Sequence, residues 1–242
     1  MTYPSVRRGF ELQDKINFSK IVLPVLSSAA DDLEYLLGRG YAINAALSLV
    51  GNHYQLTKRQ RTAVRRVTDN KDAYVKRKRK QVSHSELCNK HLFVDGFNLL
   101  ITLETALSGS LVLLSRDGTV RDLAGLRGTY RIIDKTERTI DLLFMHLRDA
   151  NAAGLTILLD QPVSNSGRLA ALIREKANDS LKHHCDLVSV DVILEHDPDK
   201  RLEKCQLVAT SDSVILDRCH SWYNVAAAII EAYIPDAWVV KI

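Results

Sequence analysis

The chain has 242 residues, of which 46% are hydrophobic and 26% charged, and its formal net charge is +4. These values are typical of a folded globular protein and exclude wholesale disorder. No run of about 18 uncharged apolar residues occurs, so we expect no membrane span. The first ten residues hold basic side chains without a following apolar run, so we expect no secretory signal. The four cysteines are scattered, with no Cys-x-x-Cys pair, which favours a reducing, cytoplasmic compartment.

Positive charge is concentrated in the first part of the chain. Residues 1–90 carry 17 Lys and Arg against 8 Asp and Glu, a net charge of +9, whereas residues 91–242 carry 16 against 21, a net charge of −5. Residues 58–80 alone hold eleven basic side chains and two acids. Such a run is typical of a solvated helix face or a flexible arm, or of a surface that binds nucleic-acid phosphates. The cations predicted to bind phosphate are Lys58, Arg59, Arg61, Arg65, Arg66, Lys76, Arg77, Lys78, Arg79 and Lys80.

The apolar spacing of the first 90 residues predicts short helices. These helices are expected over residues 27–38, 45–50 and 57–67, with Thr57 as the cap of the third. Three short helices with a basic third resemble a helix-turn-helix, but any small helical bundle gives the same pattern. We expect residues 1–69 to form a small basic helical domain. Residues 70–90 are expected to form a basic linker or an extension of the last helix.

From residue 91, strands alternate with helices. Apolar runs predict strands over residues 91–94, 155–159, 187–194, 207–210 and 238–242, and a hairpin over residues 111–123 that turns at Asp117 and Gly118. Helices are predicted over residues 98–108, 137–150, 166–176, 198–204 and 224–234. This alternation predicts an α/β domain over residues 91–242, with a mostly parallel sheet and helices on both of its faces.

Three of these strands end at or near an aspartate, namely Asp95, Asp160 and Asp212. Sites in open parallel sheets form beyond the carboxyl ends of the strands, so these side chains can converge at one edge. A single aspartate there often does no more than cap the next helix. Three carboxylates together favour a divalent cation, Mg²⁺ or Mn²⁺, because the cation offsets their repulsion and suits oxygen ligands.

Two further acids and one amide are candidates for the same site. Asp217 follows Asp212 by five residues, and Asp199 begins the predicted short helix at 198–204. Either can complete the metal shell or orient the attacking water. Asn98 is placed to bond Asp95 or a phosphate.

The loop after the second acidic strand is a candidate anion site. It lies between a strand and a helix, where backbone N–H groups can hold an anion, or where the serines can simply cap the helix. The residues concerned are Ser164, Ser166 and Gly167, and Arg168 would add positive charge.

The strand-end motifs resemble those of the PIN-like nucleases, in particular their NYN branch. Val94-Asp95-Gly96-Phe97-Asn98 resembles the opening strand motif, in which the Asp binds metal and the Asn supports the site. Residues 158–162 resemble the second acidic strand, and residues 208–215 resemble the late motif that ends in Thr-Ser-Asp. The resemblance covers about residues 91–242. It implies a three-layer α/β/α domain and a divalent-metal-dependent ribonuclease. That branch usually has an additional acid before its last motif, and Asp199 is the residue placed for it.

The whole chain also resembles a family of unknown function, number 434. The resemblance rests on residues 36–41, 56–61 and 162–167, and it implies no activity by itself.

These observations predict an enzyme that hydrolyses single-stranded RNA, with Asp95, Asp160 and Asp212 holding one or two Mg²⁺ or Mn²⁺ ions. One alternative is a non-catalytic RNA- or ribosome-binding factor with an incomplete acid set. Another is a DNA-binding regulator that uses residues 27–68, with the acidic half binding a small ligand or forming a dimer. Comparing duplex DNA with single-stranded RNA at matched salt separates the last reading from the others.

Overall fold

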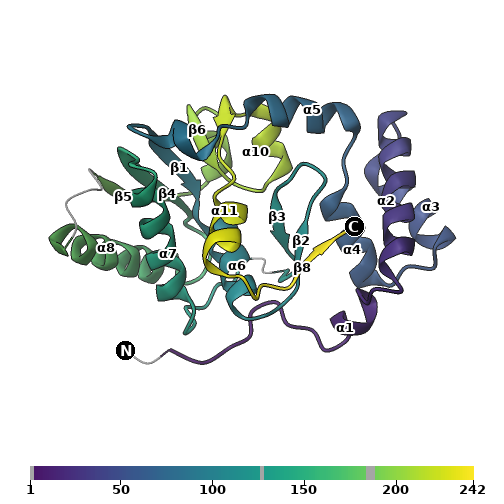
Figure 1. Cartoon of the computed structure of the whole chain (residues 1–242), viewed down its shortest axis with the longest axis horizontal. Coiled ribbons are helices and arrows are strands. Elements are labelled where there is room, and N and C mark those ends of the chain that lie inside the picture. Colours follow the sequence, from purple (N-terminus) through teal and green to yellow (C-terminus); the bar gives the residue numbers. More distant parts are fainter. Residues whose placement is uncertain (1–2, 126–127, 184–188) are drawn as a thin grey trace.

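The computed structural model describes residues 3–125, 128–183 and 189–242. Within these ranges, the chain forms two sheets and a series of helices (Figure 1). None of the helices in the described ranges has the length and apolar character that crossing a bilayer requires.

The first 90 residues form the helices that the apolar spacing predicts, together with two more. These helices are α1 (Asp14–Asn17), α2 (Leu23–Gly38), α3 (Ile43–His53), α4 (Lys58–Val67) and α5 (Lys71–Lys80), followed by a 3-10 turn at His84–Leu87. Thr57 caps α4 in a reciprocal capping box with Gln60. The chain is extended at Thr68, and the Asn70 side chain then caps α5. The basic run after α4 is therefore a separate helix.

The main sheet has five strands, all parallel, in the order β5-β4-β1-β6-β7. The strands are β1 (His91–Asp95), β4 (Gly154–Asp160), β5 (Val190–Glu195), β6 (Leu207–Ala209) and β7 (Ser221–Trp222). This confirms the predicted α/β fold with a mostly parallel sheet. The prediction began β5 at residue 187, and residues 187–188 lie outside the described ranges. The two residues of β7 are too few to give an alternating pattern, and the sequence did not predict this strand.

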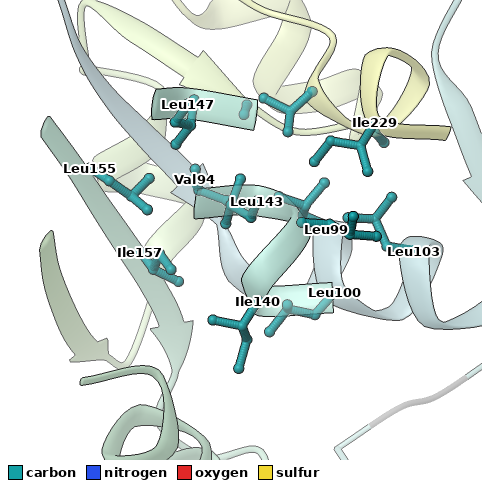
Figure 2. Packing of buried hydrophobic residues seen from close by; sticks show 14 of the residues in the cluster. Val94, Leu99, Leu100, Leu103, Ile140, Leu143, Leu147, Leu155, Ile157 and Ile229 are labelled. Carbon is teal, nitrogen blue, oxygen red and sulfur yellow. The ribbon is translucent and has the colours of Figure 1, made fainter. Parts of the chain in front are cut away.

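Helices cover both faces of this sheet, because successive residues of a strand point to opposite faces. Val94 and Ile157 join one core, whereas Phe93 and Leu158 join another. The first core is covered by α6 (Gly96–Leu107), α7 (Thr136–Asp149), α8 (Ser166–His183) and α11 (Val225–Tyr233), and Figure 2 shows its strand and helix side chains interlocking. The second core is covered by α9 (Pro198–Leu202) and α10 (Ser213–Arg218). The result is three layers.

A smaller sheet joins the N-terminal helices to the rest of the chain. It consists of β2 (Val112–Leu114), β3 (Val120–Asp122) and β8 (Val239–Lys241), in the order β3-β2-β8. The predicted hairpin is confirmed, with Gly118 in the left-handed region at φ 85°. The predicted last strand pairs with β2 in parallel rather than with the main sheet. Leu113 and Val240 share a core with α2, α3 and α4, so packing crosses the expected boundary at residue 69.

Candidate functional site

Four aspartates gather at the carboxyl edge of the main sheet. Asp95 ends β1, Asp160 ends the neighbouring strand β4, and Asp212 follows the other neighbour, β6, by three residues. Asp199 lies on α9, which packs on β1 and β4. The parallel order of β4, β1 and β6 therefore brings the three strand-end aspartates to one edge, as the sequence predicts.

The Asp95 carboxyl group is held by two hydrogen bonds. Its Oδ2 accepts from the Thr210 hydroxyl at 2.9 Å, and its Oδ1 accepts from the Asn98 backbone N–H at 3.4 Å, as the N-cap of α6. Burial raises its pKa to about 7, and the charges of Asp199 and Asp212 act in the same direction. The carboxyl group is thus partly protonated near neutral pH unless a cation compensates its charge.

Asp212 and Asn98 are linked through Ser211. Asp212 is the N-cap of α10, and its Oδ1 accepts from two backbone N–H groups of the first turn at 2.8 and 3.3 Å. The Asn98 Oδ1 accepts from both the N–H and the hydroxyl of Ser211, each at 2.9 Å. The predicted bond from Asn98 to Asp95 is made by the backbone, and the Asn98 side chain instead fixes the loop that carries Asp212.

The side-chain carboxylates of Asp160 and Asp199 and the second carboxylate oxygen of Asp212 have no hydrogen-bond or ion-pair partner within the described ranges. Burial raises the pKa of Asp199, as do the charges of Asp212, Asp197 and Asp160. As the side chains stand, no group of three or more His, Cys, Asp or Glu residues among those described is arranged to hold a metal ion. The donor chemistry nevertheless suits a hard cation, because these unpaired oxygens are the ligands that Mg²⁺ and Mn²⁺ prefer.

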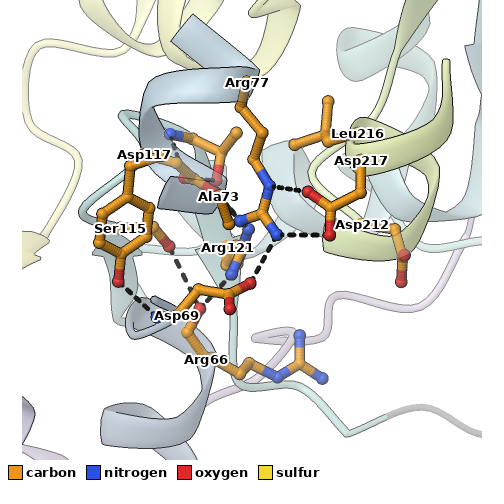
Figure 3. Close-up of polar contacts among 12 residues, drawn as sticks. Arg66, Asp69, Ala73, Arg77, Ser115, Asp117, Arg121, Asp212, Leu216 and Asp217 are labelled. Atoms are coloured by element: carbon orange, nitrogen blue, oxygen red, sulfur yellow. Dashed lines mark hydrogen bonds and ion pairs between the residues drawn. The ribbon is translucent and has the colours of Figure 1, made fainter. Parts of the chain in front are cut away.

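Asp217 belongs to a different network, which is built around Arg77 (Figure 3). The Arg77 side chain is fully buried. It donates to Asp217 at 2.7 and 3.0 Å, to Asp117 at 2.9 Å and to Asp69 at 2.5 Å. Two expectations change accordingly. The Asp217 carboxylate pairs with Arg77 rather than joining the strand-end acids, and Arg77 is enclosed where no phosphate reaches it.

A hollow of about 580 Å³ connects α4 with the carboxyl edge of the sheet. Asn98, Ser211, Asp212 and Ser213 form one part of its lining. The rest of the lining comes from α3, α4 and β3, and includes five cations: Lys58, Arg61, Arg65, Arg66 and Arg121. We call this space the basic hollow. It places the basic face of α4 beside a strand-end carboxylate, a link between distant segments that the sequence pattern did not reveal.

The cations of α4 differ in how free they are. Lys58 and Arg65 are exposed, and their charged side-chain groups have no hydrogen-bond or ion-pair partner among the described residues. Arg66 lies 4.0 Å from the Asp122 carboxylate and stays 39% exposed. Arg61 donates to a backbone carbonyl and to an asparagine side chain, each at 2.9 Å, yet still lines the basic hollow. Lys58 and Arg65 are therefore the cations most available to a phosphate.

Several other predicted phosphate ligands serve the fold or lie elsewhere. Arg59 donates to Asp14 at 2.7 and 3.0 Å and to two backbone carbonyls, so its guanidinium is fully engaged. Lys80 donates to the carbonyls of Asp217 and Cys219, at 2.9 and 3.0 Å. The other α5 residues predicted to bind phosphate are exposed but do not line the basic hollow: Lys76, Lys78 and Arg79.

The predicted anion loop uses its hydroxyls internally. The Ser164 hydroxyl accepts from the Tyr130 N–H at 3.1 Å, and the Ser166 hydroxyl donates to the Gln161 carbonyl at 3.0 Å. Gly167 and Arg168 are exposed at the start of α8. Of this set, Arg168 is the residue that presents a charged group to solvent.

Three residues of this region were missed by the sequence reasoning, namely Thr210, Ser211 and Arg121. The first two belong to the strand-end motif, where only the aspartate was assigned a role. Arg121 is a charged residue within the short strand β3 and lies 2.7 Å from Asp117. An arginine within a predicted strand of the hairpin was the signal that could have identified it, because charged side chains are buried only when they are paired.

Comparisons with known proteins identify relatives along most of the chain. Residues 84–228 match the family described as "Domain of unknown function (DUF5616)", and residues 25–80 match "Protein of unknown function (DUF434)". The predicted likeness to the latter is confirmed for residues 25–80, whereas residues 162–167, on which it also rested, lie within the match to the former. The chain is 35% identical over 191 residues to "Uncharacterized protein MJ0935" of Methanocaldococcus jannaschii. That match covers 79% of this chain and 88% of the relative. No solved structure matches the chain.

Proposed function

The chain belongs to the DUF5616 family, and we propose that it is a divalent-metal-dependent ribonuclease of PIN-like fold that cleaves single-stranded RNA. The observation that carries the proposal is the basic hollow, in which five cations line a space that reaches Asp212 and Asn98. Clustered cations attract a polyanion without reading its sequence. A strand bound there has its phosphates beside the strand-end acids.

The residues of the carboxyl edge have complementary tasks in this proposal. Asp95, Asp160, Asp199 and Asp212 would hold Mg²⁺ or Mn²⁺, which when bound lowers the pKa of a water molecule and polarises a phosphoryl oxygen. Asn98 positions the Asp212 loop through Ser211. Lys58 and Arg65 bind the phosphates of the strand, since both are exposed and unpaired.

Cleavage of a labelled single-stranded RNA tests the proposal. We expect cleavage in Mn²⁺ or Mg²⁺, none in EDTA, and a loss of at least about 100-fold in Asp95→Asn and Asp212→Asn. Asp191→Asn is the matched control, because Asp191 is exposed on β5 away from the carboxyl edge. Full activity in Asp95→Asn, or cleavage that persists in EDTA, would rule the assignment out.

One observation favours a second function, a non-catalytic RNA-binding factor. Asp95 and Asp212 each cap a helix, which is a sufficient structural reason for both residues. This alternative predicts salt-sensitive RNA binding with no metal-dependent turnover in the same assay. Duplex DNA included at matched salt tests the third possibility, a DNA-binding regulator, which predicts tighter binding of the duplex than of the single strand.

A further inference from the structure

A second hollow, of about 670 Å³, lies at the start of α8. Its lining comes from the N-terminal segment at Tyr3, from residues 131–132 and from α8. We call it the α8 hollow. Its lining is mostly apolar, and its volume is within the range of about 300–1,000 Å³ that is usual for small-ligand sites.

One face of α8 forms the helical side of this hollow. Arg168, Ala171, Leu172 and Glu175 all line it, and their spacing of three, four and seven residues places them on one stripe of the helix. Other residues of the helix point into the main core, among them Leu169, Ala170 and Ile173. The packing of α8 on the sheet thus presents this stripe to the hollow.

The opposite side of the hollow is fixed by the N-terminal segment. Arg8 forms a buried ion pair with Glu104, and its guanidinium donates to the Arg131 carbonyl at 2.6 Å. The Asp134 N–H donates to the Pro4 carbonyl at 3.3 Å. These contacts hold the segment against residues 131–134, so the hollow is formed before any ligand binds, which lowers the cost of binding.

Three charged side chains line the α8 hollow: the guanidinium groups of Arg131 and Arg168 and the carboxylate of Glu175, so positive charge exceeds negative by one. Arg131 and Arg168 are exposed, and neither makes a hydrogen bond or an ion pair with the described residues through its guanidinium. Tyr3, Ile132 and Leu172 add flat and apolar surface. An aromatic or apolar surface stacks on a nucleobase, and a guanidinium pairs with a phosphate. Among small ligands, this combination suits a nucleotide.

We propose that the α8 hollow binds one unpaired nucleotide of the RNA strand that is cleaved at the carboxyl edge. The position of that nucleotide relative to the cleaved bond rests on the proposed function. Asn165, which lines the hollow, follows Asp160 by only five residues, so the hollow adjoins the end of β4. A base held here must be unpaired, and the hollow therefore predicts a preference for single strands.

Binding in EDTA tests the proposal without any turnover. Fluorescence anisotropy compares a labelled single-stranded RNA with an abasic strand of the same length, which keeps the phosphates and lacks the bases. Ala171→Trp fills the hollow from an exposed position of α8 and leaves every charge in place. We expect this variant to bind the RNA about tenfold more weakly, as for the loss of one base–aromatic stack, and the abasic strand unchanged.

Charge variants provide the control. Arg131→Ala should weaken binding of both strands, because it removes a phosphate contact. Arg138→Ala removes an exposed arginine of α7 that does not line the hollow, and should weaken neither. An RNA affinity unchanged in Ala171→Trp, an equal loss for both strands, or a wild type that does not prefer the RNA would each overturn the nucleotide site. Base-dependent binding without cleavage would keep the site and overturn the ribonuclease proposal.

Discussion

Burial raises the pKa of the Asp95 carboxyl group to about 7, whereas an aspartate in an unfolded chain has a pKa of about 3.9. The folded state therefore binds the proton more tightly, so the free energy of unfolding falls as the pH rises from about 4 to about 7, and above pH 7 the loss is complete. In EDTA at pH 8, we expect Asp95→Asn to raise that free energy by about 1–3 kcal/mol. The gain should shrink as the pH falls from 7 towards 4, because wild-type Asp95 then becomes neutral. Urea unfolding at pH 8 and pH 5 measures both values.

If the wild type binds metal as proposed, we expect added Mn²⁺ to make it more stable than Asp95→Asn. A cation that binds only the folded state raises its melting temperature, so we expect Mn²⁺ to stabilise the wild type and to leave Asp95→Asn unchanged. Asp191→Asn serves again as the control and should follow the wild type in both conditions. An Asp95→Asn variant less stable than the wild type in EDTA at pH 8 would contradict the inferred cost of ionising the buried Asp95 carboxyl group.

The positions of single site residues could be predicted from the sequence where neighbouring residues along the chain determine their role. The sequence places Asp95, Asp160 and Asp212 at strand ends, and it offers helix capping as the ordinary role of such aspartates, a role that Asp95 and Asp212 have. The sequence alone does not show why a glycine, Gly96, must follow Asp95. A Cβ at Gly96 would lie 2.6–2.9 Å from atoms of β4, so the start of α6 approaches that strand as only glycine allows. This contact depends on the paired strand and leaves no local pattern.

At the level of elements, α5 is positioned by one buried arginine. Arg77 bonds Asp69 before the helix, Asp117 in the β2–β3 turn and Asp217 on α10, and so connects three distant segments. We expect Arg77→Ala to lower the free energy of unfolding by about 3–5 kcal/mol, because it leaves the buried Asp117 carboxylate short of a partner. Arg79→Ala, an exposed change on the same helix, should alter it by no more than about 0.5 kcal/mol. Chemical denaturation of the two variants measures the difference, and equal values would contradict a structural role for Arg77.

The structural role of Arg77 on α5 could not be predicted from the sequence. Residues 71–80 have the composition of a solvated helix, and nothing in their spacing distinguishes Arg77 from its basic neighbours. Only the placement of Asp117 and Asp217 against α5 does so. Elements with strong apolar periods, such as β1, β4 and α7, were predicted within a few residues. The partner of β8 was not, because strand pairing depends on the whole chain.

Across the whole molecule, the basic and acidic parts of the chain meet instead of forming separate bodies. The N-terminal helices share a core with β2, β3 and β8, and the same packing forms the basic hollow between α4 and the carboxyl edge. The charge division at residue 90 indicated a phosphate-binding surface, but it could not select α4 over α5. We assign the proposed phosphate contacts to α4, because α4 lines the hollow that reaches Asp212 and α5 does not.

If α4 and not α5 contacts the phosphates, substitutions on the two helices should change the salt dependence of RNA affinity by different amounts. In EDTA, the double variant Lys58→Ala/Arg65→Ala should weaken binding of single-stranded RNA and reduce the slope of log affinity against log salt by about 1.4, since each lost phosphate contact removes about 0.7. Lys76→Ala/Arg79→Ala removes the same charge from exposed positions of α5 and should change the slope much less. Anisotropy titrations over a series of salt concentrations measure both slopes. Equal reductions would show that net charge alone attracts the RNA, and the strand would then not be assigned to the basic hollow.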